Sequence, residues 1–207
     1  MTQEKPSNLA ASVRQRLLNI IRETGDDANL IWTRYANERL LYRLSVSEHA
    51  WDFILKGAML FTAWTGQSYR PTVDVDFLGH GEDGSERLVK VFRTVCAVDV
   101  KPDGLEFNAH SVKAAPIREA QEYQGQRVTM TASLGKARIP IQVDVGFGDV
   151  VTPKAGIISY PTLLDVLSHL RDFLLPPLRA ASGTAPVPFN WSAGGPWVPE
   201  KSDITPR

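Results

Sequence analysis

The apolar positions near the start of the chain recur with the period of an α-helix. They are spaced by three or four residues between Ser7 and Gly25, and again from about Asp27 to Leu44. This spacing predicts two amphipathic helices, the first capped by Ser7 and ended by Gly25. On the second helix we expect the apolar side chains to face inward (Ile31, Tyr35, Leu40, Leu41 and Leu44) and the charged ones largely outward (Arg34, Glu38, Arg39 and Arg43).

The stretch from Phe53 to Leu78 predicts one strand, one helix and a second strand. Phe53 to Leu55 is a short apolar run, Lys56-Gly57-Ala58 interrupts it, and Met59 to Trp64 is compatible with one or two helical turns. Gly66 is a natural stop for that helix.

The hydrophobic period changes to two in the second strand of this stretch. Val73, Val75 and Phe77 should therefore share one face of the strand. This leaves Asp74 and Asp76 together on the other face, about 7 Å apart. Neighbouring carboxylates repel each other unless a cation lies between them, and a divalent metal ion with oxygen ligands is the usual solution.

The clearest β-hairpin has its turn at Gly135-Lys136. Apolar residues alternate with polar ones on both sides of the turn, and the expected core face consists of Val128, Met130, Ala132, Leu134, Ile139, Ile141, Val143 and Val145. Asp144 then lies on the opposite face. In a continuous sheet it would share that face with Asp74 and Asp76.

The remaining pattern predicts one more helix, two short strands and a tail. Ser85 caps a helix that runs to about Cys96, and Leu105 to Asn108 and Ser111 to Ile117 are expected to be strands. Thr162 to Leu175 could form one amphipathic helix, but from Pro176 onward the chain is rich in Pro, Ser, Gly and Ala without periodicity. Residues 166–207 are therefore expected to be a largely disordered, Pro-rich tail. The expected fold is α+β with a mixed central sheet, divided into a helical segment (1–46), a core (47–165) and a divergent tail (166–207).

Composition narrows the classes of function. The 207 residues carry a formal net charge of zero, so any contact with nucleic acid must come from a local patch. The single cysteine, Cys96, excludes an internal disulfide and is expected to be a buried packing thiol. No stretch approaches the roughly 20 apolar residues of a membrane span, which favours a soluble cytoplasmic protein with no membrane partner.

The histidines and tryptophans add little chemistry. His49, His80, His110 and His169 lack the spacing of metal ligands and are interpreted as surface or packing residues. Trp32, Trp51 and Trp64 are expected in the core.

The polar residues of the central stretch are suited to a nucleotide. Gly57 and Ala58 would let the amides of a helix N-terminus approach a triphosphate, and Lys56 and Arg70 would add positive charge. Two Mg²⁺ ions would be held by Asp74 and Asp76. Asp144 would complete the second metal's ligands and help to accept a proton.

Each of these features also has an ordinary explanation. An Asp-x-Asp pair is common on a solvated strand face, Lys56-Gly57-Ala58 can be a simple turn, and Asp144 can be a turn-forming carboxylate. Their order along the chain and their shared face together favour the polymerase-β-like nucleotidyltransferase arrangement.

Five segments carry a resemblance to a known family, namely FILKGAMLFTAWTG, YRPTVDVDFLG, EYQGQRV, IPIQVDVGFGD and YPTLLD. Over roughly Ser12 to Asp165 the chain resembles the AbiEii/AbiGii toxins, which are nucleotidyltransferases. The resemblance implies the toxin of a bacterial toxin–antitoxin or phage-defence pair, which transfers NMP from an NTP to RNA, in some members tRNA, or to a protein. It also implies a DNA-binding antitoxin as partner. By resemblance, Lys56, Gly57 and Ala58 match the phosphate-binding turn, and Asp74, Asp76 and Asp144 match the metal-binding acids, with Ala58 standing where the family often has Gly or Ser.

After YPTLLD the chain departs from the helical half that such relatives carry. A frameshift near Val166 and genuine divergence both explain the change. Two hypotheses about activity follow: a Mg²⁺-dependent nucleotidyltransferase, which the motifs favour, and a catalytically impaired remnant that only binds nucleotide or a partner protein. A third, a sugar-nucleotide-binding Asp-x-Asp protein, is disfavoured by the phosphate-binding turn.

Overall fold

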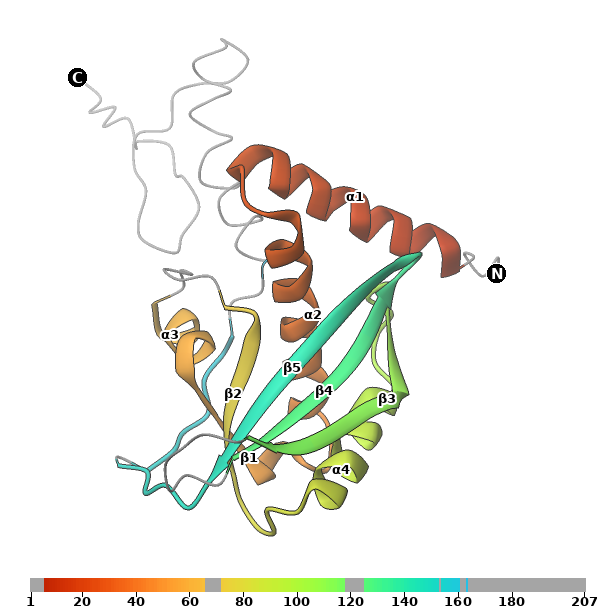
Figure 1. Ribbon diagram of the computed structural model, residues 1–207. Helices are drawn as coiled ribbons and strands as arrows, with labels where there is room; N and C mark the ends of the chain where they lie inside the picture. Colours follow the sequence, from red (N-terminus) through yellow and green to blue (C-terminus); the bar gives the residue numbers. More distant parts are fainter. Residues whose placement is uncertain (1–5, 66–71, 118–124, 153, 161–162, 164–207) are drawn as a thin grey trace, which may run out of the picture. The chain divides into compact units, whose positions relative to one another are not determined.

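The computed structural model describes residues 6–65, 72–117, 125–152, 154–160 and 163 (Figure 1). The chain divides into two compact units, Met1–Tyr160 and Pro161–Arg207, and every helix and strand below belongs to the first. The boundary expected at residue 165 and the tail expected over 166–207 lie outside the described residues.

The first unit contains helices at its N-terminus and around a sheet. Along the chain the elements are α1 (Pro6–Thr24), α2 (Ala28–Ser45), the 3₁₀ helix η1 (Ala50–Asp52), β1 (Phe53–Lys56), α3 (Gly57–Thr65), β2 (Asp74–Gly79), α4 (Ser85–Ala97), β3 (Leu105–Ile117), β4 (Gly125–Leu134) and β5 (Ala137–Phe147).

The sheet has the strand order β1-β2-β5-β4-β3. Neighbouring strands are antiparallel except β2 and β5, which are parallel, so the sheet is mixed as predicted. The β4–β5 hairpin turns at Gly135-Lys136, and Gly135 has a φ of 61°, which a glycine adopts at little cost. The predicted hairpin and its core face are confirmed.

One face of the sheet is covered by helices. The inward residues of β4 and β5 are buried against α2, which packs on β5, and α4, which packs on β3 and β4. In Figure 1, α2 and α4 pass behind the strands, while the opposite face of β3, β4 and β5 is turned toward the viewer. Exposed polar side chains of β4 and β5 lie on that opposite face, including Arg127, Thr129 and Arg138. Burial of the inner face follows from the alternation, which places every second residue on one side.

The first two helices form as predicted, with two corrections. Helix α1 begins at Pro6, so Ser7 lies inside the helix and is not its N-cap. The N-cap residue of α2, Asp27, accepts hydrogen bonds from the amides of Asn29 and Leu30. Helix α1 ends at Thr24, directly before Gly25, which has a φ of 74°. Glu38 and Arg43, which were expected to face outward, are buried. Since α2 contacts α1, α4 and β5, it has little solvent-facing surface left for charged side chains.

The buried charges of α2 are paired. Arg43 donates from Nη1 and Nη2 to the two carboxylate oxygens of Asp103 at 2.7 and 3.2 Å, and Arg39 donates to Asp103 at 2.7 Å. Arg34 donates to Glu38 at 3.0 Å. A charge that loses contact with water is tolerated when a partner satisfies it, and a helical pattern alone does not reveal that partner.

The segment from Leu105 to Ile117 is one strand with a bulge, where two short strands were expected. Its pairing with β4 shifts register between Asn108 and Lys113. The side chain of Asn108 accepts from the amide of His110, and the Ser111 hydroxyl donates to the Asn108 carbonyl and accepts from the amide of Thr131. These bonds satisfy the backbone where the ladder is interrupted.

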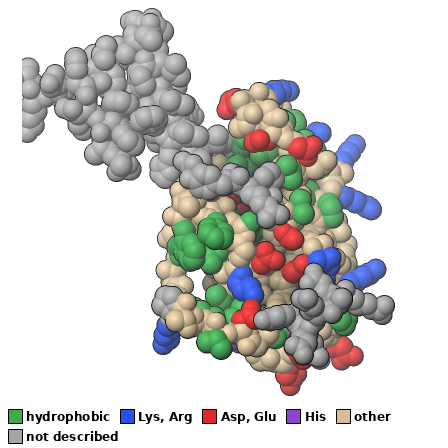
Figure 2. Space-filling view, turned by 60° about the vertical axis from the view of Figure 1, so that its left-hand side comes forward, with side chains coloured by type: hydrophobic (Ala, Val, Ile, Leu, Met, Phe, Trp, Pro, Cys, Tyr) green, Lys and Arg blue, Asp and Glu red, His purple; other side chains and the backbone are tan. Residues whose placement is uncertain are grey.

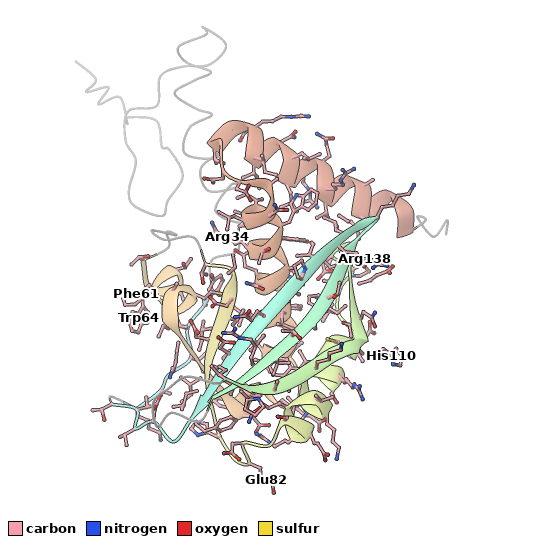
Figure 3. The ribbon with its side chains drawn as sticks, viewed as in Figure 1. Arg34, Phe61, Trp64, Glu82, His110 and Arg138 are labelled. Carbon is pink, nitrogen blue, oxygen red and sulfur yellow. The ribbon has the colours of Figure 1, made fainter. Side chains whose placement is uncertain are left out.

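Several single predictions about burial are settled by the structure. Cys96 is buried with its Sγ 3.7 Å from the sulfur of Met130, and burial raises the pKa of its thiol to about 11, as suits a packing residue. Trp51 and Trp64 are 78% and 62% exposed, so their expected place in the core is wrong. Val73 is also exposed, because β2 begins one residue later, at Asp74. Figure 3 shows Trp64 and Phe61 pointing outward from α3.

Candidate functional site

Four charged residues form a row across four neighbouring strands. Lys56 of β1 lies opposite Asp76 of β2, Asp76 lies beside Asp144 of β5, and Asp144 lies opposite Arg127 of β4. Directly paired residues point to the same face of a sheet, so two negative charges lie side by side in this row with one positive charge on either side. In the space-filling view, acidic side chains gather in the middle of one face with basic side chains next to them (Figure 2).

Asp74 completes a cluster of three carboxylates with Asp76 and Asp144. One oxygen atom from each residue lies within 4.8 Å of the other two, and all three side chains are half-buried. Among the described residues, this is the group of acidic, histidine or cysteine side chains that meets the geometry of a metal site. The predicted convergence of the three aspartates on one face is therefore what the structure has.

The electrostatics of the cluster also suit a cation. Burial raises the pKa of Asp76, and the negative charges of Asp74 and Asp144 raise it further, while Lys56 opposes them. Ionised Asp76 is thus destabilised by its neighbours, and a bound divalent cation relieves that repulsion. Oxygen donors of this kind suit hard cations such as Mg²⁺, so the residues present fit a metal ion.

The N-terminus of α3 lies against this cluster. Gly57, the first residue of the helix, has a φ of 63°, and a Cβ placed on it would collide with the carboxylate of Asp76. Position 57 therefore needs glycine for two separate reasons, its backbone conformation and the close approach of Asp76. The free amides of the first turn of α3 are as a result carried close to the acidic cluster.

Lys56 is held at the edge of the site by a residue that the sequence did not single out. Its Nζ lies 2.6 Å from a carboxylate oxygen of Asp149, which follows the end of β5. The same Nζ would be 3.7 Å from a Cβ placed on Gly146, so Lys56 reaches across the end of β5. The pair is partly exposed, with 40% of the Lys56 side chain and 34% of the Asp149 side chain accessible. Its contribution to the free energy of folding is therefore modest.

Asp144 is engaged by an arginine from the neighbouring strand. Arg127 donates from Nε and Nη2 to the two oxygens of Asp144 at 2.8 and 2.7 Å. With its amide oxygen turned toward the guanidinium, Gln142 accepts from the same two nitrogens at 3.2 Å each. Both carboxylate oxygens of Asp144 thus have a cationic donor.

Asp74 is oriented by the residue two positions before it. The hydroxyl of Thr72 donates to Oδ1 of Asp74 at 2.7 Å. This bond limits rotation of a side chain that belongs to the acidic cluster.

Sequence reasoning found the acids and missed their partners. Arg127, Thr72 and Asp149 were not predicted as site residues, although the hairpin register did carry a signal for Arg127. Pairs across the hairpin run from Leu134↔Ala137 to Arg127↔Asp144 without a shift, so counting back from the turn finds the pair. Of the predicted nucleotide-binding residues, Arg70 lies outside the described residues.

Comparison with known proteins identifies one matching family. Residues 39–182 match the family described as nucleotidyl transferase AbiEii toxin of a type IV toxin–antitoxin system. The match begins and ends later than the range inferred from the motifs. No curated protein and no solved structure matches the chain. None of the helices in the described ranges is both long and apolar enough to cross a membrane.

Proposed function

Because the chain belongs to the AbiEii family of nucleotidyltransferase toxins, we propose that it transfers a nucleotide from an NTP to an RNA acceptor with Mg²⁺ as cofactor. The observation that carries the proposal is the convergence of Asp74, Asp76 and Asp144 next to the N-terminus of α3. A cytoplasmic location and a DNA-binding antitoxin as partner belong to the same proposal.

The three aspartates are the proposed metal ligands. When bound, Mg²⁺ would neutralise triphosphate charge and lower the pKa of the attacking hydroxyl. Thr72 orients Asp74 through its 2.7 Å hydrogen bond, and β2 and β5 fix the spacing of Asp76 and Asp144 as directly paired residues. The chain's own contribution is therefore a rigid arrangement of charge that exists before substrate arrives.

The proposed triphosphate site is the turn from Lys56 to Ala58. The amides at the start of α3 are suited to phosphate oxygens, since a helix N-terminus favours negative charge. Lys56 is the nearest described cation on this side of the acids, and it would exchange Asp149 for a phosphate. Arg70 is proposed as a further phosphate contact.

An assay of label transfer tests the proposed function. The purified full chain is incubated with each α-³²P-labelled NTP and total RNA, with Mg²⁺ or with EDTA. We expect labelled RNA with one or more NTPs in Mg²⁺ alone, and a loss of at least 100-fold in Asp76→Asn. Asp99→Asn is the matched control, because Asp99 is an exposed aspartate outside the site. Nucleotide binding without any transfer to RNA would favour the impaired remnant over the enzyme.

A further inference from the structure

The pairing of Arg127 with Asp144 uses the oxygens that a metal ion would need. Nε and Nη2 of Arg127 lie 2.8 and 2.7 Å from Oδ1 and Oδ2 of Asp144. The two residues face each other directly in the β4–β5 ladder, and 44% of the arginine side chain is accessible against 18% of the aspartate. The acid is thus more enclosed than its cation, which has solvent on one side.

The other acids of the cluster have no arginine fork of this kind among the described residues. Asp74 accepts from a neutral hydroxyl, and the nearest described cation to Asp76 in the row is Lys56, whose Nζ is 2.6 Å from Asp149. Among the described cations, Arg127 is therefore the one that hydrogen-bonds directly to an acid of the cluster. It compensates one of three carboxylates that lie within 4.8 Å of one another.

We infer that Arg127 is an internal counter-ion, which makes metal binding at the three aspartates depend on a bound nucleotide. The inference rests on the proposed function, since it assumes a metal site. A metal ion alone must compete with the guanidinium for Asp144 and also experience its positive charge. A nucleotide triphosphate adds negative charge to the site, which offsets that repulsion and favours metal and nucleotide together.

The exposed position of Arg127 makes such an exchange feasible. A guanidinium that leaves Asp144 can rehydrate without crossing the core, because its side chain is nearly half accessible. The amide oxygen of Gln142 accepts from Nε and Nη2 of Arg127, so the guanidinium can keep part of its hydrogen bonding after it leaves Asp144. The arginine acts through Asp144, so it is a positioning residue.

Metal titration of the full chain without RNA tests the inference. Mn²⁺ is added to the wild type, Arg127→Gln and Arg127→Lys, and free Mn²⁺ is measured by electron paramagnetic resonance, with and without a non-hydrolysable NTP analogue. Without the analogue, Arg127→Gln should bind Mn²⁺ on the order of tenfold more tightly than the wild type, since one positive charge beside a divalent ion is removed. The analogue should tighten Mn²⁺ binding strongly in the wild type and much less in the variant. Arg127→Lys, which keeps the charge, should lie closer to the wild type.

A matched charge change on the same open face controls for the total charge. Arg138→Gln alters β5, the strand that carries Asp144, about 20 Å away along the strand, and should leave Mn²⁺ affinity unchanged. Melting in EDTA gives a second readout. Arg127→Gln should melt below the wild type, and the charge-balanced pair Arg127→Gln with Asp144→Asn should recover much of the loss.

Two results would overturn the inference in distinguishable ways. Equal or weaker Mn²⁺ binding by Arg127→Gln, with binding still abolished in Asp76→Asn, would remove the role of Arg127 and leave the proposed function intact. Absence of Mn²⁺ binding in the wild type and in every variant, with or without nucleotide, would overturn the metal site itself and the inference with it.

Discussion

At the scale of single residues, the site depends on contacts of a few atoms. Gly57 gives Asp76 the space it occupies, Thr72 restrains Asp74, and Arg127 engages both oxygens of Asp144. Of these three residues, the sequence singled out only Gly57, and for a different role. Substitutions at these three positions should therefore weaken or change metal binding by the aspartates, although the aspartates themselves are kept.

Replacing Gly57 with alanine should disable the acidic cluster. The new Cβ would collide with the carboxylate of Asp76, and a non-glycine residue at a φ of 63° costs about 1 kcal/mol. We expect lower stability and Mn²⁺ affinity at least tenfold weaker, measured by thermal unfolding and by metal titration. Gly135→Ala is the matched control, because Gly135 has a φ of 61° with nothing within 4 Å of its Cβ position. Equal Mn²⁺ affinity in both variants would show that the space beside Asp76 is unimportant.

Removing the Thr72 hydroxyl should weaken metal binding while the fold is kept. Thr72→Val loses the 2.7 Å hydrogen bond to Asp74 at nearly constant volume, and outer contacts of this kind are worth roughly 10-fold in metal affinity. Thr72→Ser should restore most of it. Isothermal titration with Mn²⁺ measures the effect, and Thr94→Val on α4, whose hydroxyl bonds only to the carbonyl of Lys90 in the described contacts, is the control. A serine variant as weak as valine would argue against the hydroxyl.

At the scale of elements, the buried carboxylate of Asp103 links α2 to the segment that leads into β3. This carboxylate accepts hydrogen bonds from Arg39, Arg43 and the amide of Leu105. The backbone carbonyl of Asp103 accepts from the Tyr35 hydroxyl at 2.8 Å. Three side chains of α2 thus bond to Asp103, which lies shortly before the edge strand β3.

Asp103 should make stability depend on acidity. Burial acts to raise its pKa, but the hydrogen bonds from Arg43 and Arg39 outweigh burial and leave the pKa lowered from 3.8. A lowered pKa means that the unfolded state binds the proton more readily. The stabilisation is therefore complete above pH 3.8 and is lost as pH falls through the folded-state pKa.

Substitution checks the assignment to Asp103. Asp103→Asn should lower the free energy of unfolding at pH 7 by about 3 kcal/mol, because two arginines lose a buried anion. Its stability should also fall less steeply than that of the wild type below pH 3.8. Denaturant unfolding at several pH values measures both effects, and the exposed Asp99→Asn is the control. Parallel acid profiles for wild type and Asp103→Asn would contradict the assignment.

At the scale of the whole molecule, local patterns predicted the elements, and long-range packing decided the rest. The hairpin and the faces of Val75, Phe77 and Asp144 follow from alternation alone, and the meeting of three aspartates was predicted on the assumption of a continuous sheet. The parallel pairing of Asp76 with Asp144 joins strands 68 positions apart in the chain, and no local pattern specifies such a register. The burial of Arg43 and the exposure of Trp64 likewise depend on which neighbours a helix acquires.

The acidic cluster should lower the stability of the metal-free protein and increase its stability when a metal ion is bound. The raised pKa of Asp76 indicates that its ionised carboxylate is unfavourable in the folded state without a cation. Asp76→Asn should therefore melt above the wild type in EDTA. Saturating Mg²⁺ should raise the melting temperature of the wild type and leave the variant unchanged. Scanning calorimetry of both proteins in EDTA and in Mg²⁺ measures these melting temperatures. If the variant melted below the wild type in EDTA, this would argue against charge repulsion in the cluster.

The bulge in β3 has a consequence for self-association. β3 and β1 are the two borders of the sheet, and a border strand offers unpaired backbone groups to other chains, as in aggregates. β1 is only four residues long, and β3 is interrupted at its bulge and carries Lys113 and Pro116, so neither provides a long, flat template. A chain whose β3 were straightened by deleting a bulge residue and replacing Lys113 with valine would be expected to form intermolecular β-structure on concentration.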